Sequence, residues 1–298
     1  MNINVAKGYA HMLKRQLIRY SKVARRFPVE VQGKKYLHQL LNTSRSNMRI
    51  DERTGWMKFN IRKLPQLKDN FTKLQTLAMR CLNEAEARRS SPEASPDKFP
   101  INLMLSTDLK EHPDILKFVL DDEFLTPASL YLGQVPRLSE LALLWSPSND
   151  TVIRSQKFHY DHRDTRQVKI FLNMNDVYEE NGPFSFLPAD VCSQFNSKIG
   201  YNQAKNDDEI VYSACNREAL VNNMGAAGMG LMVDTARCLH YGSRQNKKDR
   251  LLLMIVYVLP NCVAPRRSRT LEPVRTELAR KLFENDPIRK YVLTVKAL

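Results

Sequence analysis

The chain has 298 residues, 43% hydrophobic and 26% charged, with a formal net charge of +14, a composition typical of a globular protein. Its longest apolar run, residues 251–260, is too short to cross a bilayer, so no transmembrane segment is expected. The five cysteines are dispersed and form no CxxC pair, which argues against a disulfide framework and favours a reducing compartment. With no signal-peptide core near the basic N-terminus, we expect a cytoplasmic protein.

The positive charge is concentrated in the first third of the chain. Residues 1–90 hold 20 Lys or Arg and 6 Asp or Glu, whereas the remaining residues hold 26 of each sign. Such a surface attracts anions, so nucleic acid, an acidic membrane or a phosphorylated substrate are candidate partners. We favour the alternative of a solvated helical face, because no recognised nucleic-acid motif accompanies the charge.

Helical patterns dominate the N-terminal part. Residues 7–26 carry apolar side chains near one face among seven basic residues, and residues 67–85 repeat apolar side chains at three- and four-residue steps. A short linker rich in Ser and Pro follows at 90–96. We therefore predict a basic helical region with its linker over residues 1–96.

The pattern changes to short apolar runs after the linker. We predict a β domain over 97–265, in which 108–125 forms a helix packed on the sheet. A C-terminal helix (271–284) within 266–298 is expected to pack on this domain. The expected strands are 139–145, 168–174, 230–233 and 251–259. This spacing predicts a mostly β antiparallel barrel or sandwich with flanking helices.

The segment around His159 carries the chemistry. In a strand, residues i and i+2 project to the same face, so His159 and Asp161 would present an imidazole and a carboxylate to one point. With a distant histidine they would form a facial triad, which leaves one face of an octahedral iron(II) open. His162 and Asp164 offer a competing register, but they lie beyond the strand. We favour the first pair and expect Asp164 to hold the turn.

The third ligand is expected near the start of a later strand, and His240 follows the strand at 230–233. A dicarboxylate cosubstrate such as 2-oxoglutarate needs a fixed cation, a role that suits arginine through two parallel hydrogen bonds. Arg250 opens the next strand and is our preferred anchor, with Arg244 and Lys169 as alternatives. Asn173 shares the predicted strand face of Lys169 and is a further candidate contact for the cosubstrate.

Several ordered motifs resemble the phytanoyl-CoA dioxygenase-like family of Fe(II)/2-oxoglutarate-dependent oxygenases. The resemblance covers about residues 108–260. Its motifs are Tyr131-Leu-Gly-Gln-Val-Pro136, Leu143–Ser146, Gln156-Lys-Phe-His-Tyr-Asp161 with Asp164, Val168-Lys-Ile-Phe-Leu172, Asn175-Asp-Val177, Glu180-Asn-Gly-Pro-Phe184, Asp234-Thr235 and Leu239-His240 with Gly242.

The resemblance implies a double-stranded β-helix (jelly-roll) barrel in which His159, Asp161 and His240 hold iron and Arg250 anchors 2-oxoglutarate. Thr235, in the matched Asp-Thr motif, is expected with Lys169 and Asn173 in the cosubstrate site. One departure is Leu187-Pro-Ala-Asp190, where the family usually has Val-Pro-Gly-Ser-His. The loop that faces the substrate therefore differs here.

The expected activity is that of a non-haem iron dioxygenase that hydroxylates a small or carrier-linked, possibly anionic, organic substrate and releases succinate and CO2. Asp161 argues against a halogenase, in which a small residue at this position leaves room for chloride. Two alternatives are an oxygenase acting on a nucleic acid or other macromolecule recruited by residues 1–90, and a barrel that has lost catalysis and acts as a binding protein.

Overall fold

The computed structural model describes Leu13 and residues 23–89, 100–161, 164–200, 205–260, 262 and 268–295. The helix expected over 7–26 therefore lies mostly outside the described residues. Within them, no helix is long and apolar enough to cross a membrane.

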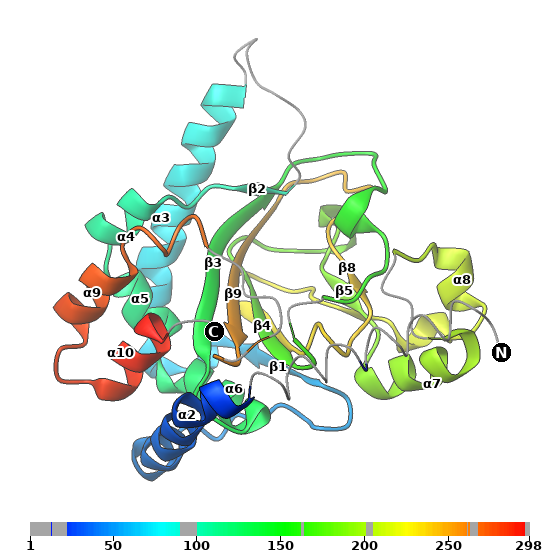
Figure 1. Cartoon of the computed structure of the whole chain (residues 1–298). Coiled ribbons are helices and arrows are strands. Elements are labelled where there is room, and N and C mark those ends of the chain that lie inside the picture. Colours follow the sequence, from blue (N-terminus) through cyan, green and yellow to red (C-terminus); the bar gives the residue numbers. More distant parts are fainter. Residues whose placement is uncertain are drawn as a thin grey trace.

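A six-stranded antiparallel sheet forms the centre of the molecule, in the order β1-β7-β4-β9-β3-β2 (Figure 1). Its strands are β1 (Trp56–Asn60), β2 (Ile101–Asn102), β3 (Arg137–Ser146), β4 (Gln167–Asn173), β7 (Met229–Val233) and β9 (Arg250–Val258). The four predicted strands correspond to β3, β4, β7 and β9. Every residue of β4 and of β9 is buried, because both faces of these central strands are covered.

A smaller sheet, β6-β5-β8, faces one side of the large sheet. It consists of β5 (Ser185–Phe186), β6 (Val221–Asn222) and β8 (His240–Tyr241). A bridge between His159 and His240 extends it. The two sheets together form the expected double-stranded β-helix, whose interior lies between them. Helices α7 (Ala189–Ile199) and α8 (Asp208–Tyr212) and the 3-10 turns η2 (Arg154–Gln156), η3 (Glu179–Asn181) and η4 (Arg217–Ala219) belong to this side of the molecule.

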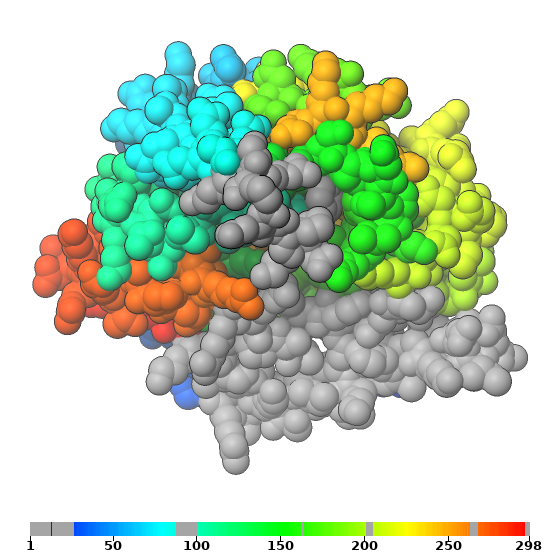
Figure 2. Space-filling view, turned by 90° about the horizontal axis from the view of Figure 1, so that it is seen from above, coloured from blue at the N-terminus to red at the C-terminus, as the bar shows by residue number. Residues whose placement is uncertain are grey.

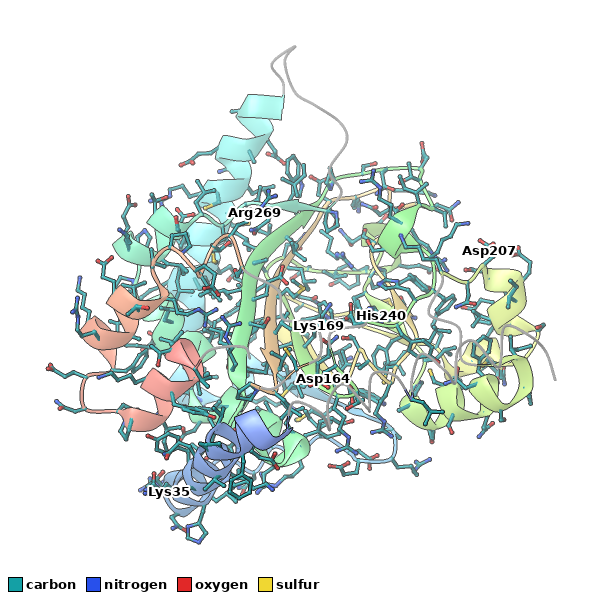
Figure 3. The ribbon with its side chains drawn as sticks, viewed as in Figure 1. Lys35, Asp164, Lys169, Asp207, His240 and Arg269 are labelled. Carbon is teal, nitrogen blue, oxygen red and sulfur yellow. The ribbon has the colours of Figure 1, made fainter. Side chains whose placement is uncertain are left out.

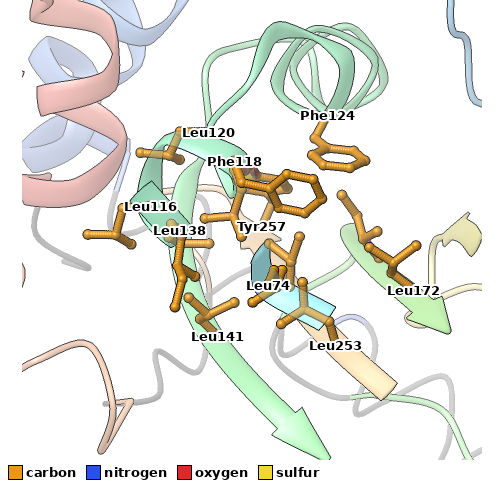
Figure 4. Close-up of a cluster of buried hydrophobic side chains, with 14 of the residues drawn as sticks. Leu74, Leu116, Phe118, Leu120, Phe124, Leu138, Leu141, Leu172, Leu253 and Tyr257 are labelled. Carbon is orange, nitrogen blue, oxygen red and sulfur yellow. Dashed lines mark hydrogen bonds between the residues drawn. The ribbon is translucent and has the colours of Figure 1, made fainter. Parts of the chain in front are cut away.

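The other face of the large sheet is covered by helices from both ends of the chain. They are α2 (Val23–Thr43), α3 (Pro65–Arg89), α4 (Ser106–Glu111), α5 (Asp114–Val119), α6 (Asp122–Leu132), α9 (Arg275–Leu282) and α10 (Pro287–Thr294), with η1 (Ile61–Lys63) leading into α3. Figure 4 shows Leu74 of α3, Phe124 of α6 and Leu253 of β9 in one apolar cluster. Burial of this cluster is the main source of the fold's stability.

The boundary expected after residue 96 does not separate two cores. Strand β1, from the N-terminal part, pairs with β7 over five residues, and Leu67 and Phe71 of α3 are buried in the same cluster as Leu172 and Leu253. The described N-terminal residues are thus an integral layer of the barrel domain. Apolar periodicity predicted α3 but could not indicate which sheet its face covers.

Two helix predictions need correction. Residues 108–125 do not form one helix but contribute to three, since Pro113 lacks the N–H that a continuing helix would need, and Asp121 caps α6 by accepting a hydrogen bond from the Glu123 backbone N–H. The helix expected over 271–284 is shorter, at 275–282, after a series of turns. Helices α2, α7, α8 and α10 were not predicted.

Gly230 of β7 lies in close contact with the neighbouring strands. It pairs with Phe59 of β1, and a Cβ atom at this position would overlap the Phe59 ring and lie 3.0 Å from the Phe171 carbonyl oxygen. We expect Gly230→Ala to destabilise the protein by about 2 kcal/mol, the usual cost of overpacking a core. Urea unfolding measures this loss, and the exposed Lys58→Ala on β1 is the control. Equal midpoints for Gly230→Ala and wild type would contradict this packing.

Candidate functional site

Three predicted ligands meet inside the barrel. His159 and His240 exchange both backbone hydrogen bonds, at 2.9 and 3.0 Å, and the Asp161 backbone N–H donates to the Thr235 carbonyl oxygen at 2.9 Å. One ligand atom from each of His159, Asp161 and His240 lies within 4.8 Å of the others. The structure thus brings together the residues of the favoured register. His162, of the competing register, lies outside the described residues. Asp164 accepts a hydrogen bond from the Thr165 backbone N–H within the turn.

Both imidazoles are held in a defined orientation. Nδ1 of His159 lies 2.8 Å from the Lys157 carbonyl oxygen, and Nδ1 of His240 lies 2.9 Å from the Cys238 carbonyl oxygen. Because a carbonyl oxygen only accepts, each Nδ1 carries the proton and each Nε2 keeps a free lone pair. The Nε2 atom of His240 is 3.6 Å from Oδ2 of Asp161. In metal-ligating histidines, the ring nitrogen that does not bind the metal regularly donates a hydrogen bond, as both Nδ1 atoms do here.

Burial and charge fix the protonation states of the three ligands. Burial lowers the pKa of His240 to about 3 and also lowers the pKa of His159. Burial alone would raise the pKa of Asp161, but the Lys169 ammonium, 2.6 Å from Oδ2, and His240 lower it far below the ordinary value. At neutral pH the site therefore offers two neutral imidazoles and one carboxylate, a donor set suited to a divalent metal.

The metal-free protein is expected to become less stable as the pH falls. The unfolded chain protonates His240 near its ordinary pKa of 6.5, whereas the folded chain does so only near 3. This stability is therefore complete above pH 6.5 and is lost as the pH falls toward 3. Thermal unfolding of chelator-treated protein between pH 7.5 and 4.5 measures it. Wild type should lose more stability over this interval than His240→Gln, and parallel curves would refute the assignment.

Thr235 lies behind Asp161 rather than in the cavity. Its carbonyl oxygen accepts the Asp161 N–H, its hydroxyl hydrogen-bonds the Asp161 carboxylate and so helps to lower the Asp161 pKa, and its Oγ1 accepts from Gln167 Nε2 at 2.7 Å. Thr235 is fully buried. It positions Asp161, and the structure does not place it in the cosubstrate site where the sequence led us to expect it.

A cavity of about 1240 Å³ opens from these ligands. Figure 3 shows Lys169 and His240 in the middle of the barrel, with Arg269 near the upper end of β3. The lining residues include the three ligands and the following others: Glu140, Leu144, Arg154, Lys169, Phe171, Phe184, Arg250, Leu252, Met254, Arg269 and residues of the 100–107 segment. The barrel interior is therefore a binding site rather than a filled core.

Arg250 lines this cavity as a buried cation. Its side chain donates to the Gly182 carbonyl oxygen at 2.9 Å and to Ser146 Oγ at 3.2 Å, while its Nε atom has no hydrogen-bond partner within the part of the chain that the structure describes. Only 3% of Arg250 is exposed, and burial lowers its pKa to about 10. A buried guanidinium without a carboxylate is unfavourable by itself, so this position favours an anionic ligand.

The two alternative anchors are already paired. Arg244 donates two hydrogen bonds of 2.8 Å to the Asp208 carboxylate and lies over the Tyr241 ring. Lys169 lines the cavity, but its ammonium pairs with Asp161. Of the three candidate cations, Arg250 alone keeps its charge uncompensated among the described residues.

Asn173 lies on the same strand face as Lys169 but does not reach the cavity. Its Oδ1 accepts from Asn223 Nδ2 at 3.0 Å, and its Nδ2 donates to the Asn223 carbonyl oxygen at 3.3 Å. These bonds tie β4 to the chain after β6. The structure therefore does not bring Asn173 into contact with the site, although alternation placed it on the correct face.

Sequence reasoning missed the aromatic wall beside the ligands. Phe171 and Phe184 stack with ring centroids 3.8 Å apart, and the Phe184 ring lies 5.6 Å from that of His240. Both line the cavity, where they limit access of water to the ligands. Phe171 follows Lys169 by two residues, and this alternation was the available signal.

Comparison with solved structures identifies the same fold class. The apoform of EctD from S. alaskensis matches with a TM-score of 0.50 and 15% identity over 72% of this chain and 81% of that chain. The carbocyclase SnoK from nogalamycin biosynthesis matches at 0.49 and 14%, over 78% and 89%, and HygX from Streptomyces hygroscopicus at 0.45 and 18%, over 70% and 84%. No protein-family model and no curated protein matches the chain. At 15% identity the similarity to EctD supports the double-stranded β-helix fold alone.

Proposed function

We propose that this chain is an Fe(II)/2-oxoglutarate-dependent dioxygenase of the phytanoyl-CoA dioxygenase-like family, in which His159, Asp161 and His240 hold the iron and Arg250 binds 2-oxoglutarate. The observation that carries the proposal is the buried, uncompensated Arg250 in the same cavity as a triad of two histidines and one carboxylate. EctD, whose apoform shares the fold, has also been solved with bound Fe and with 2-oxoglutarate.

The triad fits iron(II) by its donor set. Two imidazole nitrogens and one carboxylate oxygen on one side of an ion are typical of non-haem iron oxygenases. The free lone pairs on Nε2 of His159 and His240 are available without loss of a proton, because both Nδ1 atoms donate to backbone carbonyls. Asp161 remains ionised and is held by Thr235 from behind.

Arg250 fits the distal carboxylate of 2-oxoglutarate. Its guanidinium is fixed by Gly182 and Ser146, so its remaining N–H groups are oriented before the ligand arrives, which lowers the entropy cost of binding. A charge-assisted hydrogen bond to a carboxylate would also remove the cost of burying the cation alone. Alternate residues of a strand project to the same face, so Arg250 shares the inward-facing side of β9 with Leu252 and Met254.

With both groups bound, the iron and the keto acid supply oxidation of a substrate C–H bond to C–OH while 2-oxoglutarate and O2 are converted to succinate and CO2. The protein's own residues hold and orient the reactants. Phe171 and Phe184 limit water at the ligands, and the rest of the cavity leaves room for a small or carrier-linked substrate. Hydroxylation is the outcome we propose.

Iron-dependent succinate formation tests the function without a known substrate. Purified protein incubated with 2-oxoglutarate, O2 and Fe(II) should form succinate slowly, and His159→Ala should reduce the rate to the level without iron. Arg280→Gln, an exposed change on α9 outside the cavity, is the control for purification and folding. Equal rates for His159→Ala and wild type would eliminate the proposal.

A further inference from the structure

The cavity is larger than iron and 2-oxoglutarate require. Its volume of about 1240 Å³ exceeds the ~300–1,000 Å³ usual for small-ligand pockets. From the triad it extends to an outer rim formed by residues 100–107 and 268–270 and by Arg154 with Ser155. In the view from above, the teal segment after residue 100, the green segment near 150 and the orange segment after 268 lie on the same face of the molecule (Figure 2). A second organic molecule fits between the rim and the triad.

Several cations line the cavity, and most of them already have a partner or a role in the proposed reaction. Lys169 pairs with Asp161, and Arg250 is assigned to the cosubstrate. Glu140 and Arg154 also line the cavity, and both have other interactions. Arg269 is different, because it is exposed at the rim and makes no hydrogen bond or ion pair with any described residue. It is therefore available to a ligand.

The sequence around Arg269 is basic. The sequence holds no Asp or Glu between Arg250 and Glu272, whereas Arg266 and Arg267 lie within three residues of Arg269. An exposed cation at the rim raises the local concentration of anionic ligands.

One wall of the cavity beside the triad is apolar. Leu144 of β3 pairs with Leu252 of β9, and both line the cavity together with Met254 and the stacked Phe171 and Phe184. A ligand that reaches the metal ligands must therefore place hydrocarbon along this wall. Its charged group would lose its hydration there without gaining a partner, so that group belongs at the rim.

We infer that the prime substrate is an amphipathic organic anion whose carboxylate or phosphate binds Arg269 and whose apolar body extends past Leu144 and Leu252 to the triad. The inference rests on the proposed function, since it assigns the substrate class of that site. It makes Arg269 a residue that determines specificity and gives it no part in the oxidation.

Calorimetric titration of the full chain, saturated with Mn(II) and 2-oxoglutarate, tests the inference. The probes are octanoate, octyl phosphate, 1-octanol and octyltrimethylammonium, which share one chain length and differ in charge. At least one anion should bind about ten-fold more tightly than the neutral and cationic probes, as expected for one charged contact. The two anions distinguish a carboxylate from a phosphate ester.

Arg269→Gln should remove this preference, weakening the anion about ten-fold and leaving 1-octanol unchanged. Arg280→Gln removes the same charge from an exposed site outside the cavity and should keep the preference. Equal affinity of all four probes, no binding of any probe, or an unchanged preference in Arg269→Gln would overturn the inference.

The same titration without Mn(II) and 2-oxoglutarate, together with the succinate assay, distinguishes failure of the substrate inference from failure of the proposed function. If the dioxygenase proposal is wrong, succinate formation is absent while the preference that depends on Arg269 persists. If the substrate inference is wrong, succinate formation is intact and the preference is absent.

Discussion

Asp161→Asn is expected to abolish metal binding. The substitution keeps the shape of the side chain but removes the only carboxylate of the triad, so an ion would face two neutral imidazoles and the Lys169 ammonium that now pairs with Asp161. We expect more than a ~100-fold loss of affinity, since even residues that only support metal ligands cost 10–100-fold. Anaerobic calorimetry with Fe(II), or with Mn(II) in air, measures the change.

Asp150→Asn is the matched control for this variant. Asp150 is exposed on the loop after β3 and does not line the cavity, so its removal changes the net charge by the same amount without touching the site. It should bind metal like wild type. Metal affinity in Asp161→Asn within two-fold of the control would show that the triad does not hold the ion.

Arg250→Gln is expected to weaken 2-oxoglutarate binding about 100-fold, because truncation of a buried charge pair costs 2–5 kcal/mol. The glutamine keeps hydrogen-bonding capacity toward Gly182 and Ser146, so the fold should persist. The measurement is the dissociation constant of 2-oxoglutarate with metal-saturated protein.

Two further variants decide between the candidate anchors. Arg244→Gln removes a guanidinium that is already paired with Asp208, and Lys169→Met removes an ammonium that is paired with Asp161. Both should keep 2-oxoglutarate affinity within a few-fold of wild type when metal is saturating. A large loss in Lys169→Met with none in Arg250→Gln would instead identify Lys169 as the anchor.

The long strands were predictable because they are continuous apolar runs. β3, β4, β7 and β9 each lie within two residues of their predicted bounds. Strands β5, β6 and β8 have only two residues each, too few to show the alternation of a strand. They are defined by their pairing with one another in the folded chain, which a local pattern does not show. Helix α2 contains Pro28 and Gly33, residues that disfavour a helix, so the sequence did not indicate it.

The proximity of the three candidate ligands was predictable to a similar degree. Alternation places His159 and Asp161 on one face, and ordered motifs pointed to His240, which the structure brings beside them. Contacts between residues far apart in the sequence could not be predicted. Asn223 holds Asn173 away from the cavity, and Asp208 neutralises Arg244; both partners are more than 30 residues from the residue they hold, so local patterns could not reveal them.

Anaerobic titration with Fe(II) and 2-oxoglutarate tests the central claim, that His159, Asp161 and His240 hold an iron whose open face accepts a keto acid anchored by Arg250. Wild-type protein should develop a visible charge-transfer band that saturates at one iron per chain and requires both additions, and Asp161→Asn should show none. A wild-type protein that binds neither component and develops no band would contradict the account.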